Sequence, residues 1–198
     1  MRLALILGIC APFAALQSAH AQHAGDIGLM PVGGRLTTGV FAGASFFPGQ
    51  RVFQAPLGTQ FPNFASDPGF DSLPGAFVPG ARIGFTILDS LRRWNGADFS
   101  EIPPERLRIS FGPVTPIDSP STPQNVQGFS LSVGSNGEWH RHLQYTLLDP
   151  ASDGVYLLSL QLWSDQGGIQ PSAPFWLVFN QNRPAGEHDQ AAQWAVVH

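Results

Sequence analysis

The sequence predicts an all-β fold, an antiparallel β-sandwich resembling a jelly roll, with one short C-terminal helix. Three observations support this prediction. Short segments with alternating apolar and polar residues recur along the chain. The 22 glycines and 18 prolines supply many turns. Charged residues make up only 12% of the chain, which suits many short strands better than the polar faces of a helical bundle.

The first half of the chain begins with a predicted hairpin. Residues 26–32 and 35–41 flank Gly33-Gly34, a pair typical of two-residue hairpin turns. Residues 43–80 are rich in Gly, Pro and Phe, which predicts a long ordered loop held by its aromatic side chains. Alternating segments at 82–88, 106–111 and 129–133 predict further strands.

The second half contains the segment that is richest in side chains able to bind a ligand or a metal ion. Residues 138–148 alternate, so this segment is predicted as a half-buried strand, with residues 155–163 as its antiparallel partner. The apolar run 175–179 predicts a central strand, and residues 187–197 predict the helix. About nine strands and one helix are therefore expected, arranged as two packed sheets.

The N-terminus has the features of a secretory signal peptide. Arg2 precedes an apolar stretch, and Ala19-His20-Ala21 fits the small-residue rule for cleavage. We therefore expect a signal peptide at residues 1–21, a single sandwich domain at 22–198, and a secreted or periplasmic location. No membrane span is expected after cleavage. The only cysteine, Cys10, lies within the signal peptide, so the remaining chain has no disulfide or thiolate ligand.

Composition excludes several classes of function. The chain has no lysine, which excludes Schiff-base chemistry. Its net charge is −4 and it has no basic cluster, so nucleic acid is not an expected partner. The turns at 67–71 and 149–154 carry carboxylates, but they lack the ligand series of a calcium loop and are interpreted as turn geometry.

Histidines offer the clearest candidate site. His140 and His142 share the polar face of the predicted strand, about 6.6 Å apart along it, so two neutral imidazoles could converge on one divalent metal ion. Imidazole and carboxylate ligands without sulfur suit zinc, with copper as the alternative. The competing interpretation is that both histidines simply occupy a solvated strand face. The proposed metal ligands are His23, His140, His142 and His188, with Asp26, Glu187 or Asp189 as additional ligands or hydrogen-bond partners.

Several motifs resemble those of one group of exported bacterial proteins. They are His23-Ala24-Gly25-Asp26-Ile27, Asp67-Pro68-Gly69-Phe70, Trp139-His140-Arg141-His142-Leu143, Gly154-Val155-Tyr156-Leu157-Leu158, Pro174-Phe175-Trp176-Leu177-Val178-Phe179-Asn180 and the terminal helix. The chain is similar to a cyanobacterial family that is repressed by the zinc-uptake regulator and often ends in a PEP-CTERM sorting tail. The resemblance implies extracellular zinc binding or allocation through His23, His140 and His142, with His188 as a further ligand. The Pro-Glu-Pro motif of that tail does not occur in the sequence, so surface anchoring by that route is not expected.

Three functions follow as hypotheses. The first is a non-enzymatic metal-binding protein for buffering or allocation, which would release its metal when the histidines are protonated near pH 6. The second is a metal-dependent extracellular enzyme with Glu138 or Glu187 as general base. The third is a structural or adhesive sandwich that binds no metal.

Overall fold

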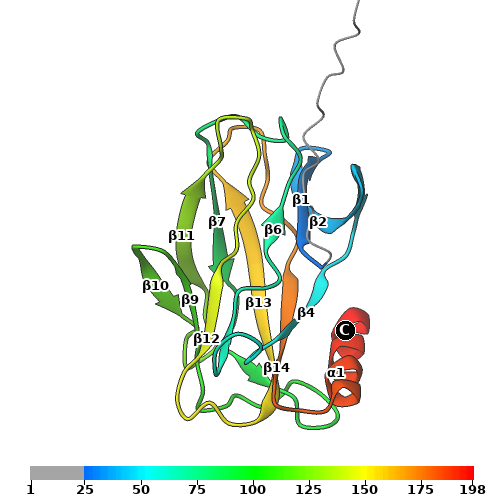
Figure 1. Ribbon diagram of the computed structural model, residues 1–198, viewed down its shortest axis with the longest axis vertical. Helices are drawn as coiled ribbons and strands as arrows, with labels where there is room; N and C mark the ends of the chain where they lie inside the picture. The colour runs from blue at the N-terminus through cyan, green and yellow to red at the C-terminus, as the bar shows by residue number, and fades with distance from the viewer. Residues whose placement is uncertain (1–24) are drawn as a thin grey trace, which may run out of the picture.

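Three β-sheets and one helix make up the computed structural model, which describes residues 25–198 (Figure 1). The largest sheet, here called sheet B, has the strand order β11-β7-β13-β14-β4, with the short β8 also paired to β13. Its strands are β4 (Val52–Pro56), β7 (Arg82–Ile87), β8 (Arg92–Arg93), β11 (Val126–Ser132), β13 (Gly154–Ser164) and β14 (Phe175–Gln181).

Two smaller sheets contain the remaining strands. Sheet A has the order β3-β2-β1-β6, and sheet C has the order β10-β9-β12-β5. Sheet A consists of β1 (Ile27–Val32), β2 (Arg35–Ala42), β3 (Ser45–Pro48) and β6 (Phe70–Asp71). Sheet C consists of β5 (Phe64–Ala65), β9 (Leu107–Phe111), β10 (Val114–Asp118) and β12 (Gln144–Leu147). Most pairs are antiparallel, but β1 pairs with β6 and β14 with β4 in parallel.

The main core lies between sheet B and the two smaller sheets. Successive residues of a strand point to opposite faces, so β14 contributes alternate residues to this core. All three sheets contribute buried side chains to it, including Phe175, Leu177 and Phe179 of β14, Leu158 of β13, Ile27 and Leu29 of β1, Phe70 of β6 and Tyr145 of β12. This arrangement confirms the predicted sandwich.

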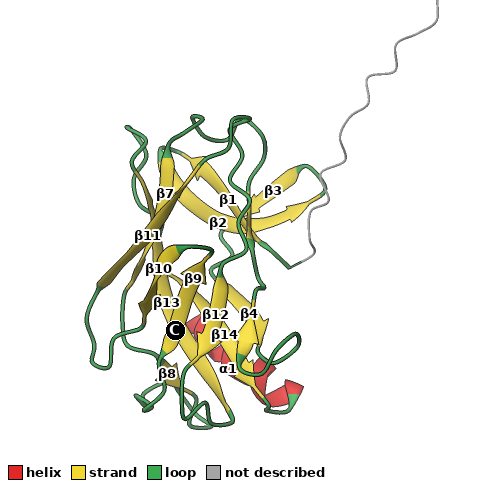
Figure 2. Ribbon diagram, turned by 60° about the vertical axis from the view of Figure 1, so that its left-hand side comes forward, coloured by secondary structure: helices red, strands yellow, loops and turns green. Residues whose placement is uncertain are grey.

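The helix α1 (Ala185–Val197) covers the other face of sheet B. Val178 of β14 and Leu157 of β13 point away from the main core and pack with Ala191 and Ala195 of the helix. Figure 2 shows the helix in red beside β4 and β14. The predicted C-terminal helix is therefore confirmed, and none of the described helical residues forms a helix long and apolar enough to cross a bilayer.

Several local predictions are confirmed. β1 and β2 form the expected hairpin, and Gly33 and Gly34 adopt positive φ values of 57° and 78°, as its tight turn requires. β14 lies between β13 and β4, so the apolar run at 175–179 is an internal strand. The number of strands was underestimated: four short strands form between residues 43 and 80, where a loop was expected, and β8 and β10 are further short strands outside the expected segments.

The predicted partner of the histidine segment is wrong. β13 is fully buried over its first five residues, 154–158, and pairs with β7, β14 and β8. Its two edges are therefore occupied within sheet B. The predicted strand 138–148 forms regular strand only over β12, which pairs with β9 and β5. In the preceding part of that predicted strand, residues 138–143, the one bridge to another segment is that of Arg141 with Phe70.

Candidate metal centre

Backbone pairing brings three distant segments to one place. Ile27 and Gly28 of β1 pair in parallel with Phe70 and Asp71 of β6. On the other side of β6, Phe70 and Arg141 exchange two backbone hydrogen bonds of 2.8 and 2.9 Å. Residues just before β1, around β6 and on either side of Arg141 therefore lie side by side.

The histidine segment keeps its alternation although it is not a regular strand. Trp139 and Leu143 are each 2% exposed and belong to the main core. His140 and His142 point the opposite way, with side chains 33% and 28% exposed. The two rings are thus partly shielded from water but accessible from one side.

The surroundings of His142 determine which of its nitrogens carries the proton. Nδ1 lies 3.2 Å from the carbonyl oxygen of Ser66 and 3.1 Å from Oδ1 of Asp67. A carbonyl oxygen can only accept, so Nδ1 is the donor. In the neutral ring, Nε2 then presents its lone pair to the site. A hydrogen bond of this kind, from the far nitrogen to a carboxylate or carbonyl, is the usual support of a metal-binding histidine.

The two imidazoles face each other through the same type of atom. Nε2 of His140 lies 3.1 Å from Nε2 of His142. Because His142 carries its proton on Nδ1, Nε2 of His140 is the donor of this hydrogen bond, and a metal ion could take the place of the shared proton. Two nitrogen ligands at 2.0–2.1 Å from a tetrahedral zinc ion are about 3.3 Å apart, so the observed separation fits a shared ion.

Asp26 supplies a third donor atom. Its Oδ2 lies 3.6 Å from Nε2 of His142, and its side chain is 6% exposed. The other oxygen, Oδ1, accepts a 2.9 Å hydrogen bond from the amide of Gly69, while the amide of Ile27 donates to the carbonyl of Gly69. These bonds fix the carboxylate, and its donor atom and those of both histidines all lie within 4.8 Å of one another.

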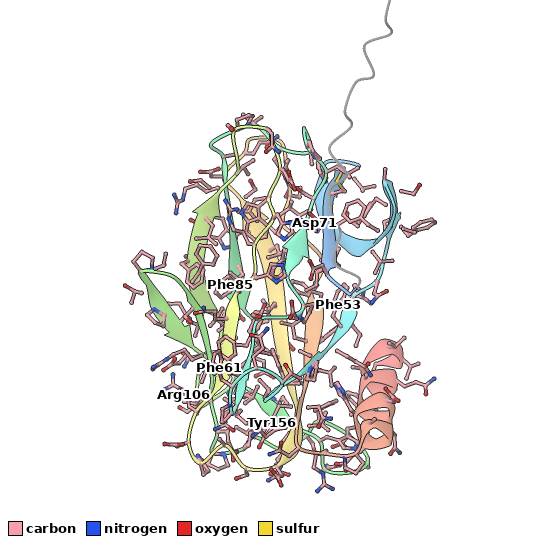
Figure 3. All side chains as sticks on the ribbon, viewed as in Figure 1. Phe53, Phe61, Asp71, Phe85, Arg106 and Tyr156 are labelled. Atoms are coloured by element: carbon pink, nitrogen blue, oxygen red, sulfur yellow. The ribbon has the colours of Figure 1, made fainter. Side chains whose placement is uncertain are left out.

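Acidic side chains gather on the other side of His140. Asp71, Glu138 and His140 form a second group whose donor atoms lie within 4.8 Å of one another. Burial raises the pKa of Asp71, and the carboxylates of Glu138 and Asp26 raise it further, against the opposing effect of His140. Figure 3 labels Asp71, the second residue of β6. The cluster therefore concentrates negative charge in a partly buried place, which a divalent cation would offset.

Gly69 allows the backbone to approach the ring of His142. A Cβ atom at this position would lie 2.6 to 2.8 Å from three atoms of the imidazole, closer than real contacts permit. The glycine at this position is thus required by the ring, and not only by the turn that the sequence indicated.

The remaining predicted ligands are placed elsewhere or lie outside the described residues. His188 is buried on α1, where its Nε2 lies 2.8 Å from the carbonyl oxygen of Val178, on the helix side of sheet B. Glu187 pairs with Arg183, and Asp189 accepts a hydrogen bond from Gln54. In Figure 3 the helix lies low on the right, well away from Asp71. His23 and the predicted signal peptide lie outside the described residues.

Three acidic residues of the site were not among the predicted ligands. Asp67 and Asp71 belong to a turn that was interpreted as structural, and Glu138 was considered only as a general base. The one signal in the sequence was the pair of aspartates flanking Gly69-Phe70. Their proximity to the histidines depends on the backbone bridge between Phe70 and Arg141, which no local pattern indicates.

Comparisons with protein-family models, curated proteins and solved structures give no significant match to this chain. Interpretation of the site therefore depends on its own geometry. Two imidazole nitrogens and one carboxylate oxygen that converge in this way can coordinate zinc or copper(II) without sulfur.

Proposed function

We propose that this chain is an exported protein that binds a divalent metal ion, zinc foremost, in order to buffer or allocate it outside the cytoplasm. The observation that carries the proposal is the convergence of two Nε2 atoms, 3.1 Å apart, on the position also faced by Asp26. The predicted export signal and the resemblance to zinc-regulated proteins add support from the sequence.

The donor set explains the choice of metal. Nitrogen from His140 and His142 with oxygen from Asp26 suits zinc, and the same set would also accept copper(II). Calcium and magnesium prefer sites made entirely of oxygen donors, so they fit less well.

His23 is the proposed fourth ligand. It precedes Asp26 by three residues in the sequence. An imidazole carried by this short segment would complete a tetrahedral set. His188, which contacts Val178, is not part of the proposed set.

The test is zinc titration of the untagged protein by calorimetry after metal removal with a chelator. We expect the paired variant His140→Ala/His142→Ala to lose zinc binding, and His23→Ala to bind more weakly. His198→Ala serves as the histidine control, because this exposed ring stacks on Trp194 at the end of the helix.

Circular dichroism and melting of the metal-free proteins would establish that each variant is folded. A folded paired variant that keeps the wild-type zinc affinity would show that these imidazoles are not ligands. Absence of zinc and copper binding by the wild-type protein would overturn the proposed function altogether.

A further inference from the structure

The imidazole of His140 faces two different sets of donor atoms. Its Nε2 points toward His142, whereas its Nδ1 lies 3.5 Å from Oδ1 of Asp71. Glu138 completes the second set, in which the three donor atoms lie within 4.8 Å of one another. The ring therefore stands between two groups that could each hold an ion.

The distance on the Asp71 side fits coordination better than a direct hydrogen bond. Hydrogen bonds from N–H to oxygen usually span 2.7–3.2 Å, so 3.5 Å is long. A nitrogen and an oxygen bound to one zinc ion are about 3.4 Å apart when the angle is tetrahedral. The separation of Nδ1 and Oδ1 is that of two ligands of a common ion.

Both acidic donors are held in place by neighbouring groups. The Asp71 side chain is 8% exposed, on the strand that pairs with β1. The side-chain amide nitrogen of Asn136, Nδ2, donates a hydrogen bond to Oε2 of Glu138 at 2.7 Å. The residues that follow Asp71 and Glu138 are also hydrogen-bonded to each other, because the backbone N–H of Trp139 donates to the hydroxyl of Ser72 at 2.8 Å.

We propose that the centre is dinuclear, with a second divalent ion held by Asp71, Glu138 and Nδ1 of His140. This inference rests on the proposed function, because the first ion is the one bound by His140, His142 and Asp26. The ring of His140 would bridge the two ions as an imidazolate, after its remaining N–H proton passes to solvent. No electron transfer is involved, and water would fill the other coordination positions.

The charges of the proposed ligands alone match two divalent ions. Two divalent ions carry four positive charges, and three carboxylates with one imidazolate carry four negative charges. A single ion would leave Asp71 and Glu138 close together without a compensating divalent cation. A partly buried cluster favours the arrangement in which the charges balance.

Metal stoichiometry tests the proposal directly. The untagged protein, stripped of metal and then loaded with zinc, is measured by native mass spectrometry and elemental analysis. We expect two zinc ions in the wild-type protein and one in Glu138→Gln and in Asp71→Asn. Glu101→Gln is the control, because Glu101 pairs with Arg93 on β8, and it should keep two ions.

Copper(II) provides a second measurement that a purely structural role would not affect. Imidazolate bridging couples the spins of two copper ions, so loading with two equivalents should weaken the electron paramagnetic resonance signal per copper. Glu138→Gln should restore the full signal of one isolated copper ion.

The outcomes separate the two proposals. One zinc ion in the wild-type protein, unchanged in Glu138→Gln and lost in His140→Ala/His142→Ala, would overturn the dinuclear centre but keep the proposed function. Absence of any bound ion would overturn both. If Glu138→Gln fails to fold, an uncoupled copper signal from the wild-type protein loaded with two equivalents would still overturn the bridge.

Discussion

Two histidine environments in this molecule differ in what the ring nitrogens face. Under the helix, Nε2 of His188 lies 2.8 Å from one backbone carbonyl, in a buried apolar layer. Beside β6, the Nε2 atoms of His140 and His142 face each other, with carboxylates around them. The first ring has an acceptor for its proton, whereas the second pair brings two ring nitrogens to a point that one proton or one metal ion can share.

This difference shows that burial and residue type alone do not identify a ligand. His188 is more buried than either ring of the pair, at 7% exposed, yet its contact is that of a structural histidine that links helix and sheet. In the partly exposed pair, His142 has on its far nitrogen the hydrogen-bond acceptors that support a metal-binding histidine. Variants of each environment should therefore affect different measurements.

The largest effect is expected from His188→Ala. It removes a buried ring and its contact with the carbonyl of Val178, so we expect a loss of about 2–4 kcal/mol in the free energy of unfolding. Zinc affinity should stay at the wild-type value. Chemical denaturation and calorimetry measure the two quantities, and a large loss of zinc affinity in the folded variant would place His188 in the metal site after all.

Gly69→Ala should have the next largest effect, on metal affinity. The new methyl group would push the ring of His142 away from its position, so we expect zinc affinity to fall about 100-fold. Gly167→Ala is the matched control, because no atom lies within 4 Å of the Cβ it would add. Equal zinc affinities in the two variants would show that the ring position does not matter for binding.

Asp67→Ala should have a smaller effect on the same site. Asp67 is one of two acceptors for Nδ1 of His142, and the Ser66 carbonyl would remain, so we expect about a tenfold loss of zinc affinity. Asp189→Ala is the control, since it only removes the acceptor of a hydrogen bond from Gln54. If both variants lose affinity equally, the orientation of His142 is not the cause.

The smallest effect is expected from Asp118→Asn, which changes a carboxylate that belongs to neither histidine environment. Arg108 donates hydrogen bonds of 2.7 and 3.0 Å to the two carboxylate oxygens of Asp118 and lowers the pKa of this carboxyl. The ion pair therefore stabilises the fold above the ordinary carboxyl pKa, and this stabilisation is lost as the pH falls through the lowered value.

Because the pair is partly exposed, Asp118→Asn should cost less than about 1 kcal/mol at pH 7. The difference from wild type should shrink toward pH 2 and in high salt, and zinc affinity should not change. Denaturation at several pH values measures this. A difference that persists at pH 2 would contradict the ionic explanation.

Sequence alone was sufficient for the elements whose pattern is local. Alternation and the Gly33-Gly34 turn predicted the first hairpin, and a continuous apolar run predicted the internal strand β14. The pairing of β13 could not be predicted in the same way, because a strand buried on both faces fits any place inside a sheet. β5 and β6, which have two residues each, are too short to show an alternating pattern in the sequence.

The candidate site was predicted only in part. Alternation placed His140 and His142 on one face, and Asp26 was named beside them. Asp67, Asp71 and Glu138 join them through the parallel pairing of β1 with β6 and the single bridge at Arg141. Contacts of this kind depend on tertiary topology, whereas His188 was grouped with the pair only because it is also a histidine.

The pairing of β1 with β6 has a consequence for the order of folding and metal binding. Asp26 reaches the histidines only when the first strand has docked, so an unfolded chain does not present the assembled donors. Metal capture would then report that folding is complete, and free zinc at 100 times the dissociation constant would add about 2.7 kcal/mol to the docked state. Hydrogen exchange of the β1 amides would slow when zinc binds, because the bound ion stabilises the docked position of this strand.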